Sequence, residues 1–166
     1  MKIDIAEAVR NEGELFTSEY HGAFDGIDFL GERYEFPQGI RVRADYRFDG
    51  EGCIVTGRFD ADATVNCARC LKAFLYSIGF DFAEYYKKQP EEGEYAYQDD
   101  TIELDQCLED NVVLNLPTRF LCREDCKGLC SQCGKDLNEG ECGCQPKVDP
   151  ANPFFGLSKL YDDEEV

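Results

Sequence analysis

The sequence has no tryptophan, a single histidine, and only 17 lysines and arginines against 35 aspartates and glutamates. Because His21 is the only histidine, no Ser-His-Asp catalytic triad can be argued. No glycine-rich loop of the kind that cradles phosphates is present. The carboxylates fall in turns and polar faces rather than in a recognisable pair. We therefore expect the protein not to be an enzyme.

Long hydrophobic runs are also missing, since no segment approaches the roughly 20 apolar residues that a membrane-spanning helix needs. The N-terminal residues include Asp4 and Glu7 where a signal peptide would be apolar. We expect an untargeted, cytoplasmic protein without membrane contact. In a reducing cytoplasm, ten cysteines in clusters more often bind metal than form disulfides.

The formal net charge of −18 argues against the chain gripping a phosphate backbone by itself. Affinity for nucleic acids comes largely from lysine and arginine side chains that displace counterions. An acidic protein that works near RNA would more readily hold a basic partner, such as a basic ribosomal protein. The alternative is that the charge only provides solubility.

Three segments alternate apolar and polar residues, the period-two pattern of half-buried strands: Ile40–Phe48, Val55–Asn66 and Phe74–Phe82. The turn at residues 49–52 separates the first two, and Cys67-Ala-Arg-Cys70 separates the last two. We expect a mainly β, α+β fold, an antiparallel meander or partly open barrel. The cysteine pair would then lie at the end of a hairpin.

One or two helices complete the expected fold. Leu104, Leu108 and Val112 recur every four residues before Pro117, which predicts a helix packed on the sheet. This helix ends an acidic stretch, residues 89–118, that has nine acids and no lysine or arginine. Residues 2–20 fit a short helix or a strand.

The pattern divides the chain into three parts. Residues 1–118 form a β-rich body ending in the acidic helix, 119–146 a small cysteine-rich zinc knuckle, and 147–166 a tail. In the tail, Asn152 followed by Pro153 predicts the start of a short helix. That helix either docks on the body or binds a partner.

The knuckle predicts a zinc site from its six cysteines: Cys122, Cys126, Cys130, Cys133, Cys142 and Cys144. Two thiolates spaced as in Cys130-x-x-Cys133 can close a turn around a tetrahedral ion, and Gly134 permits the positive φ of such a turn. An all-thiolate site is closed and structural. Six cysteines compete for four places, so the tetrad stays open. A disulfide module or an iron–sulfur cluster are alternatives, although the usual cluster spacings are missing.

The upstream pair, Cys67 and Cys70, admits three readings. It could be a redox pair, although redox motifs of this spacing belong to a βαβ setting. It could join the C-terminal cysteines, since eight cysteines suffice for two zinc sites. It could also be a buried packing feature, because cysteine is often buried. We expect Cys53 and Cys107 to be core residues or free thiols.

Three arginines alternate along one side of a predicted strand: Arg41, Arg43 and Arg47. They could form a basic stripe that contacts RNA, extended by Arg58, Arg69 and Lys72. The alternative is a solvated sheet face on which the arginines pair with acids.

The cysteine motifs resemble those of the bacterial YceD family, described as large ribosomal RNA subunit accumulation proteins. The resemblance covers residues 40–160 and is most specific in the cysteine-rich run. The matching motifs are Cys67-Ala-Arg-Cys70-Leu71, Leu116-Pro117, Leu121-Cys122-x-x-Asp125-Cys126-Lys-Gly128-Leu129-Cys130-x-x-Cys133-Gly134-x-x-Leu137-Asn138, Asp149-Pro150 and Asn152-Pro153-Phe154.

The resemblance implies a cytoplasmic, non-enzymatic role in accumulation of large-subunit (23S) rRNA during ribosome biogenesis. Some members of the family lack the C-terminal cysteines and keep the upstream pair. By that pattern the knuckle is an elaboration and not the core of the function, and the pattern weakens the idea that Cys67 and Cys70 need the C-terminal cysteines. We expect an acidic adaptor for a basic ribosomal partner or a pre-ribosomal particle. A redox- or zinc-responsive regulatory protein is the alternative.

Overall fold

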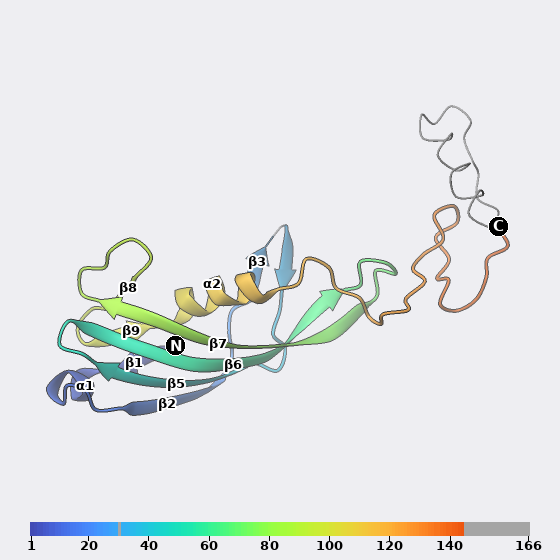
Figure 1. Ribbon diagram of the computed structural model, residues 1–166. Helices are drawn as coiled ribbons and strands as arrows, with labels where there is room; N and C mark the ends of the chain where they lie inside the picture. The colour runs from blue at the N-terminus through green and yellow to red at the C-terminus, as the bar shows by residue number, and fades with distance from the viewer. Residues whose placement is uncertain (30, 145–166) are drawn as a thin grey trace, which may run out of the picture.

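The computed structural model describes residues 1–29 and 31–144 (Figure 1). No helix among these residues is long and apolar enough to cross a membrane. The predicted short helix of residues 147–166 lies outside them. The strands and helices of the described part are β1 Lys2–Asp4, α1 Ala6–Arg10, β2 Phe16–Gly22, β3 Ile27–Phe29, β4 Glu32–Tyr34, β5 Ile40–Phe48, β6 Gly52–Asn66, β7 Ala73–Lys87, β8 Tyr95–Ala96, β9 Thr101–Glu103 and α2 Asp105–Asn115.

The main sheet has five strands in the order β2-β5-β6-β7-β8. The first four strands pair antiparallel, and the short β8 pairs parallel with β7. The predicted meander is therefore confirmed, as an open sheet. Residues 2–20, whose pattern fitted either state, contain a short strand, a short helix and the edge strand β2. Two small sheets, β1-β9 and β3-β4, complete the described strands.

The alternation in the sequence corresponds to the two faces of this sheet. Along β6, Val55, Phe59 and Ala63 are buried on the inner face, whereas Thr56 and Arg58 are exposed on the outer face. Every second side chain of a strand points to the same face, so one face can be apolar throughout. Cys53 is also buried on β6, and both it and Cys107 of α2 are free thiols in the core.

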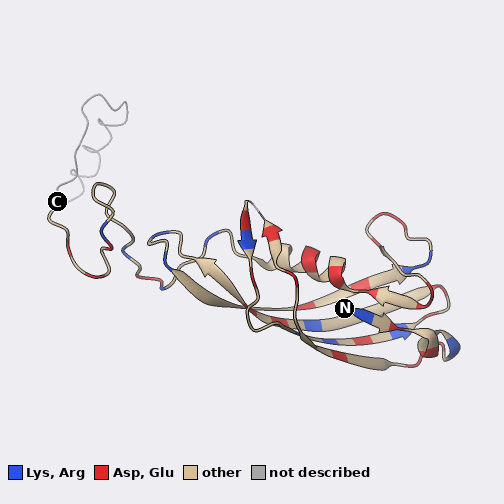
Figure 2. Cartoon of the chain, turned by 180° about the vertical axis from the view of Figure 1, so that it is seen from behind, with Lys and Arg blue, Asp and Glu red and all other residues tan. Residues whose placement is uncertain are grey.

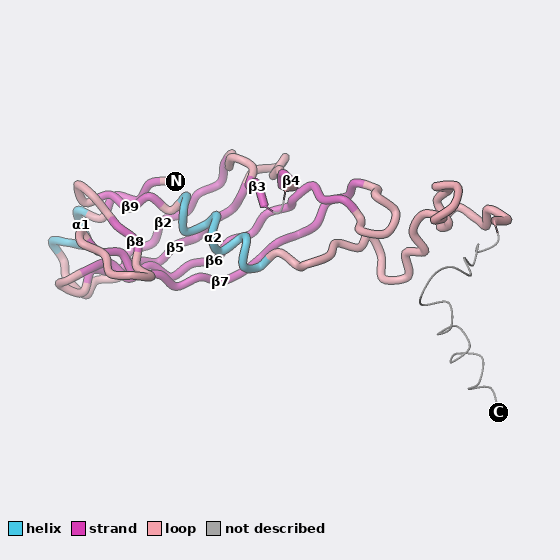
Figure 3. Tube along the Cα trace, turned by 90° about the horizontal axis from the view of Figure 1, so that it is seen from above, coloured by secondary structure: helices cyan, strands magenta, loops and turns pink. Residues whose placement is uncertain are grey.

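Helix α2 lies across the apolar face of the sheet (Figures 1 and 3). Leu104, Leu108 and Val112, the residues that predicted the helix, are fully buried, and this confirms that it packs on the sheet. The helix ends because Leu116 adopts an extended conformation, with φ −69° and ψ 131°. A residue that precedes proline is pushed out of the helical region, and Leu116 precedes Pro117.

The β6–β7 hairpin is longer than the rest of the sheet. Pairing of β5 with β6 stops at Ile40↔Ala61, whereas β6 and β7 stay paired as far as Asn66↔Ala73. Residues 62–66 of β6 therefore carry the hairpin past the end of β5. Figure 1 shows this arm reaching towards the cysteine-rich segment. Its tip holds the first candidate site.

Candidate metal centres

The loop at the tip of the hairpin presents Cys67 and Cys70 on a tight turn. The amide of Cys67 donates to the carbonyl oxygen of Lys72 at 3.0 Å, and the amide of Leu71 donates to the carbonyl oxygen of Cys67 at 2.9 Å. Leu71 has a φ of 60°, in the left-handed region that residues other than glycine seldom adopt. These contacts close the loop around the cysteine pair.

The segment after α2 runs back to the same loop and brings two further cysteines. The carbonyl oxygen of Phe120 accepts a hydrogen bond from the Ala68 amide at 2.8 Å. The buried ring of Phe120 packs against Tyr34 and Tyr76, with ring centroids 5.9 and 5.1 Å away. This anchor lies two residues before Cys122 and places the following turn over the hairpin tip.

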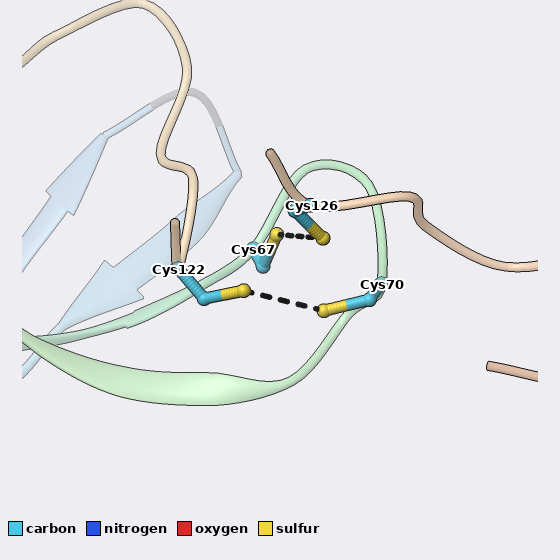
Figure 4. A group of neighbouring side chains, drawn as sticks. All are labelled: Cys67, Cys70, Cys122 and Cys126. Carbon is cyan, nitrogen blue, oxygen red and sulfur yellow. Dashed lines mark hydrogen bonds between the residues drawn. The ribbon is translucent and has the colours of Figure 1, made fainter. Parts of the chain in front are cut away.

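The first centre consists of Cys67, Cys70, Cys122 and Cys126, whose Sγ atoms all lie within 4.8 Å of one another (Figure 4). The Cys67–Cys126 and Cys70–Cys122 sulfurs are 3.8 and 3.7 Å apart. Four sulfurs about 2.3 Å from a central ion would be separated by about 3.8 Å, whereas a disulfide requires about 2.05 Å. The arrangement fits a tetrahedral ion, and all ten cysteines are free thiols.

Burial and hydrogen bonds prepare this centre for a cation. Cys67, Cys70 and Cys126 are buried. Amides of Cys122, Cys70 and Arg69 point at the Cys67 sulfur and lower the pKa of this thiol to about 6, against the opposing effect of burial. Burial and the neighbouring thiols raise the pKa of Cys122 to about 12. The cluster thus holds one favoured thiolate and one thiol that resists ionisation until a positive ion enters.

The second centre consists of Cys130, Cys133, Cys142 and Cys144, again with all sulfurs within 4.8 Å of one another. Amides of Cys133 and Gln132 lower the pKa of the Cys130 thiol to about 6. Hydrogen bonds with Cys133 and Cys142 raise the pKa of Cys144 to about 12. Unlike the first centre it is open to solvent, since Cys133 and Cys144 are exposed.

The two centres are built on the same backbone turn. In the second, the amide of Cys130 donates to the Lys135 carbonyl oxygen at 2.8 Å, and the amide of Gly134 donates to that of Cys130 at 2.9 Å. These two hydrogen bonds join residues five and four positions apart, as do the two hydrogen bonds that close the turn at Cys67. Gly134 has a φ of 73° and occupies the position that Leu71 holds in the first turn. The sequence carried this signal as a repeated Cys-x-x-Cys-x-Lys, at residues 67–72 and 130–135.

A residue that the sequence did not single out as functional connects the centres. Asn138 belongs to the loop of the second centre, and its Nδ2 lies 3.4 Å from Cys126 Sγ of the first. Its Oδ1 accepts hydrogen bonds from the Lys127 amide and from Arg123 Nη2, at 2.8 and 2.7 Å. The backbone adds a bond of 2.9 Å from the Leu137 amide to the Gly128 carbonyl oxygen. The two centres therefore form one packed module.

The structure resolves the choice of tetrads into two sets of four. Of the six predicted C-terminal ligands, Cys122 and Cys126 lie with Cys67 and Cys70, and the other four lie together. The family pattern suggested that Cys67 and Cys70 do not need the C-terminal cysteines. In this chain they lie together with two of those cysteines, Cys122 and Cys126. The hairpin turn and the returning segment supply half of the first centre each.

The three arginines of the expected basic stripe lie on the outer face of the sheet, among acids. Arg43 pairs with Glu19 at 3.4 Å, and Arg41 faces Asp60 across the strands. Neighbouring Arg58 pairs with Asp60 and Asp81, at 3.2 and 3.4 Å. Arg47 is exposed farther along the same strand. Figure 2 shows both signs of charge mixed over this face. RNA contact by the stripe stays a prediction.

Comparison with known proteins gives a consistent family. The family profile described as "Large ribosomal RNA subunit accumulation protein YceD" matches residues 55–161. The uncharacterized protein Rv2926c of Mycobacterium tuberculosis is 33% identical over 161 residues, covering 90% of this chain and 77% of its own. The uncharacterized protein ML1660 of Mycobacterium leprae is 30% identical over 111 residues, covering 60% and 50%. No solved structure matches the chain. The profile match includes the hairpin and both cysteine centres, and this chain belongs to the YceD family.

Proposed function

We propose that the protein is a non-enzymatic bacterial ribosome-biogenesis factor that supports accumulation of large-subunit (23S) rRNA in the cytoplasm. The family profile, which runs from β6 through both cysteine centres, is the observation that carries this proposal. Within the described residues, the groups of side chains that could hold a metal ion are the two sets of thiols. Such sets hold a fold together, and this supports a binding role over a catalytic one.

Zinc is the metal we assign to both centres. Four thiolates with tetrahedral spacing suit zinc or an iron–sulfur cluster, and the spacings lack the usual cluster runs. Bound zinc would supply a crosslink and no open position for chemistry. In the first centre, Cys67 and Cys70 would tie the hairpin to Cys122 and Cys126 of the returning segment.

The acidic body is proposed to hold a basic ribosomal protein. Residues 1–65 and 73–116 contain nine lysines and arginines against twenty-five aspartates and glutamates. Acidic residues lie along α2 and in the loops around it, as the red segments of Figure 2 show. A surface of one sign attracts a partner of the other and speeds its encounter. This adaptor role is consistent with a protein that acts beside RNA while being strongly acidic.

The test is the ratio of large-subunit to small-subunit rRNA in source cells depleted of the protein. We expect the ratio to fall and wild-type protein to restore it. Rescue with Cys67→Ala/Cys70→Ala and with Cys130→Ala/Cys133→Ala separates the requirement for each centre. A ratio that stays unchanged on depletion would contradict the proposed function.

A redox- or zinc-responsive role is the second candidate, because Cys133 and Cys144 of the second centre are exposed. Thiolates that solvent can reach are the ones that oxidise, and this open centre holds Cys130, whose pKa is lowered to about 6. This candidate requires reversible zinc release at the second centre under mild peroxide. Zinc retention, with all thiols unmodified, would rule it out.

A further inference from the structure

The cations of this acidic protein are concentrated around the first metal centre. We use the name clamp for residues 66–72 and 117–130, the hairpin loop and the segment that packs on it. The clamp contains five lysines and arginines against two acids, while the rest of residues 1–116 contain nine against twenty-five. A polyanion would be repelled by most of residues 1–116 and attracted to the clamp.

Three of the clamp cations are free to bind a ligand. Lys72, Arg119 and Lys127 are exposed, and the charged side chain of none of them forms a hydrogen bond or ion pair with the described residues. The side chains of the other two, Arg69 and Arg123, bind neighbouring groups of the clamp. Arg69 donates to the carbonyl oxygens of Glu124 and Cys126, at 3.3 and 2.8 Å, and Arg123 pairs with Asp125 at 3.3 Å.

The first centre sets the positions of these free cations. Arg119 lines a hollow together with Ala68 and Leu71 of the hairpin loop. Lys72 lines a second hollow with Cys70, Cys122 and Arg123, and Asp136 and Glu139 of the second centre's loop line it as well. Lys127 follows Cys126 directly in the chain.

The cations are accessible at the surface while the metal-binding sulfurs are mostly covered. Three of the four cysteines of the first centre are buried. The negative thiolates are thus shielded from an approaching polyanion. The exposed side chain of Leu71, 67% accessible, lines the same hollow as Arg119 and adds an apolar contact.

We propose that the clamp is an RNA-contact surface, on which Lys72, Arg119 and Lys127 bind phosphates of large-subunit rRNA. The inference rests on the proposed function and deepens it by naming where the RNA binds. On the sheet face, Arg43 and Arg58 form ion pairs with acids and Arg41 faces Asp60 across the strands, but no acid pairs with Lys72, Arg119 or Lys127 among the described residues. The acidic body then points away from the RNA and stays available to a basic protein.

The test is filter binding of the zinc-loaded full chain to an in vitro 23S rRNA transcript over a range of salt concentrations. Lys72→Ala/Arg119→Ala/Lys127→Ala is compared with Arg41→Ala/Arg43→Ala/Arg47→Ala, which removes the same charge from the sheet face. We expect the clamp variant to bind about tenfold or more weakly and to lose about 2 to 3 from its salt slope, since each phosphate contact contributes about 0.7 to 0.9. The sheet variant should bind like the wild type. Zinc content checks that both variants fold.

Three results would each overturn the clamp assignment: the same loss of RNA affinity in both variants, a loss of affinity in the sheet variant alone, or no RNA binding by the wild type. The depletion experiment separates this failure from failure of the proposed function. If depletion lowers the rRNA ratio but the clamp variant restores it fully, the function stands and the RNA contact is wrong. Failure of the clamp variant to restore the ratio, together with its weaker binding, supports the inference.

Discussion

Asn138 Nδ2 lies 3.4 Å from Cys126 Sγ, so a side chain of the second centre donates to a sulfur of the first. Hydrogen bonds to thiolate sulfurs orient metal ligands and tune the affinity for the metal. Asn138 is itself fixed, because the Asp136 carboxylate accepts from its backbone amide at 2.8 Å. The occupancy of one centre is thereby connected to the folding of the other.

We expect Asn138→Ala to weaken zinc binding at the first centre by about 10- to 100-fold, the usual effect of removing such a partner. Competition with a chromogenic chelator measures this directly. Asn115→Ala is the control, because Asn115 donates only within its own helix, to the Asn111 carbonyl oxygen at 2.8 Å. Equal zinc affinity in Asn138→Ala and wild type would show that the bond is dispensable.

The two tetrads predict two zinc ions per chain by elemental analysis. Cys67→Ser should reduce the content to one, and Cys130→Ser should also reduce it to one. The second centre should lose its metal to a chelator first, because Cys133 and Cys144 are exposed. A stoichiometry of one in the wild type would refute the separation into two centres.

Zinc binding should depend on pH, since thiols must lose their protons to bind metal. The pKa of Cys67 and of Cys130 is lowered from 9.0 to about 6. A lowered pKa stabilises the folded state fully above pH 9, and this contribution disappears as the pH falls through about 6. Zinc should thus be retained near neutral pH and released below about pH 6, which dialysis followed by metal analysis measures. Full retention at about pH 4 would contradict this.

A strong chelator should unfold the cysteine module and leave the sheet intact. The segment 121–144 is held mainly by its two centres, whereas β5, β6 and β7 share the buried core around α2. We expect amide protection, followed by hydrogen exchange, to fall in residues 121–144 and to persist in β6 as far as Ala61. Collapse of the whole exchange pattern would mean that the module and the sheet fold as one unit.

Leu71→Gly should leave the protein as stable as before or raise the free energy of unfolding by up to about 1 kcal/mol. The left-handed φ of 60° strains a leucine by about 1 kcal/mol, and glycine adopts it freely. The matched control is Leu75→Gly, also at an exposed leucine but within β7, where glycine should destabilise by about 0.5 to 1 kcal/mol. Thermal or urea unfolding distinguishes the two. A large loss in Leu71→Gly would point to a packing role for this side chain.

The sheet and α2 could be predicted because their residues alternate with the period of the element that they form. The apolar residues repeat every second position from Val55 to Val65 and every fourth position from Leu104 to Val112. This repeat indicates which face of each element is buried, and the structure buries those faces. The parallel partner β8 could not be predicted, since Tyr95 and Ala96 are too short a segment to carry a period.

Assignment of the two tetrads depended on three-dimensional proximity. Spacing along the chain groups Cys122 and Cys126 with their neighbours, but Phe120 anchors that segment to the hairpin, far upstream in sequence. The Cys-x-x-Cys-x-Lys sequence is common to both turns. It did not indicate their partners. Asn138 was not identifiable because one hydrogen bond to a sulfur leaves no pattern in the sequence.

The pairing of β6 with β7 constrains how this arm can vary between relatives. Every residue from Gly52↔Lys87 to Asn66↔Ala73 is paired without a bulge, and the loop that follows must present both cysteines to Cys122 and Cys126. One inserted residue would reverse the side-chain facing of all positions beyond it. The arm can lengthen or shorten only by matched pairs of residues in both strands, together with a compensating change after α2. We therefore expect the β6–β7 arm to have the same length in every relative that keeps the four cysteines of the first centre.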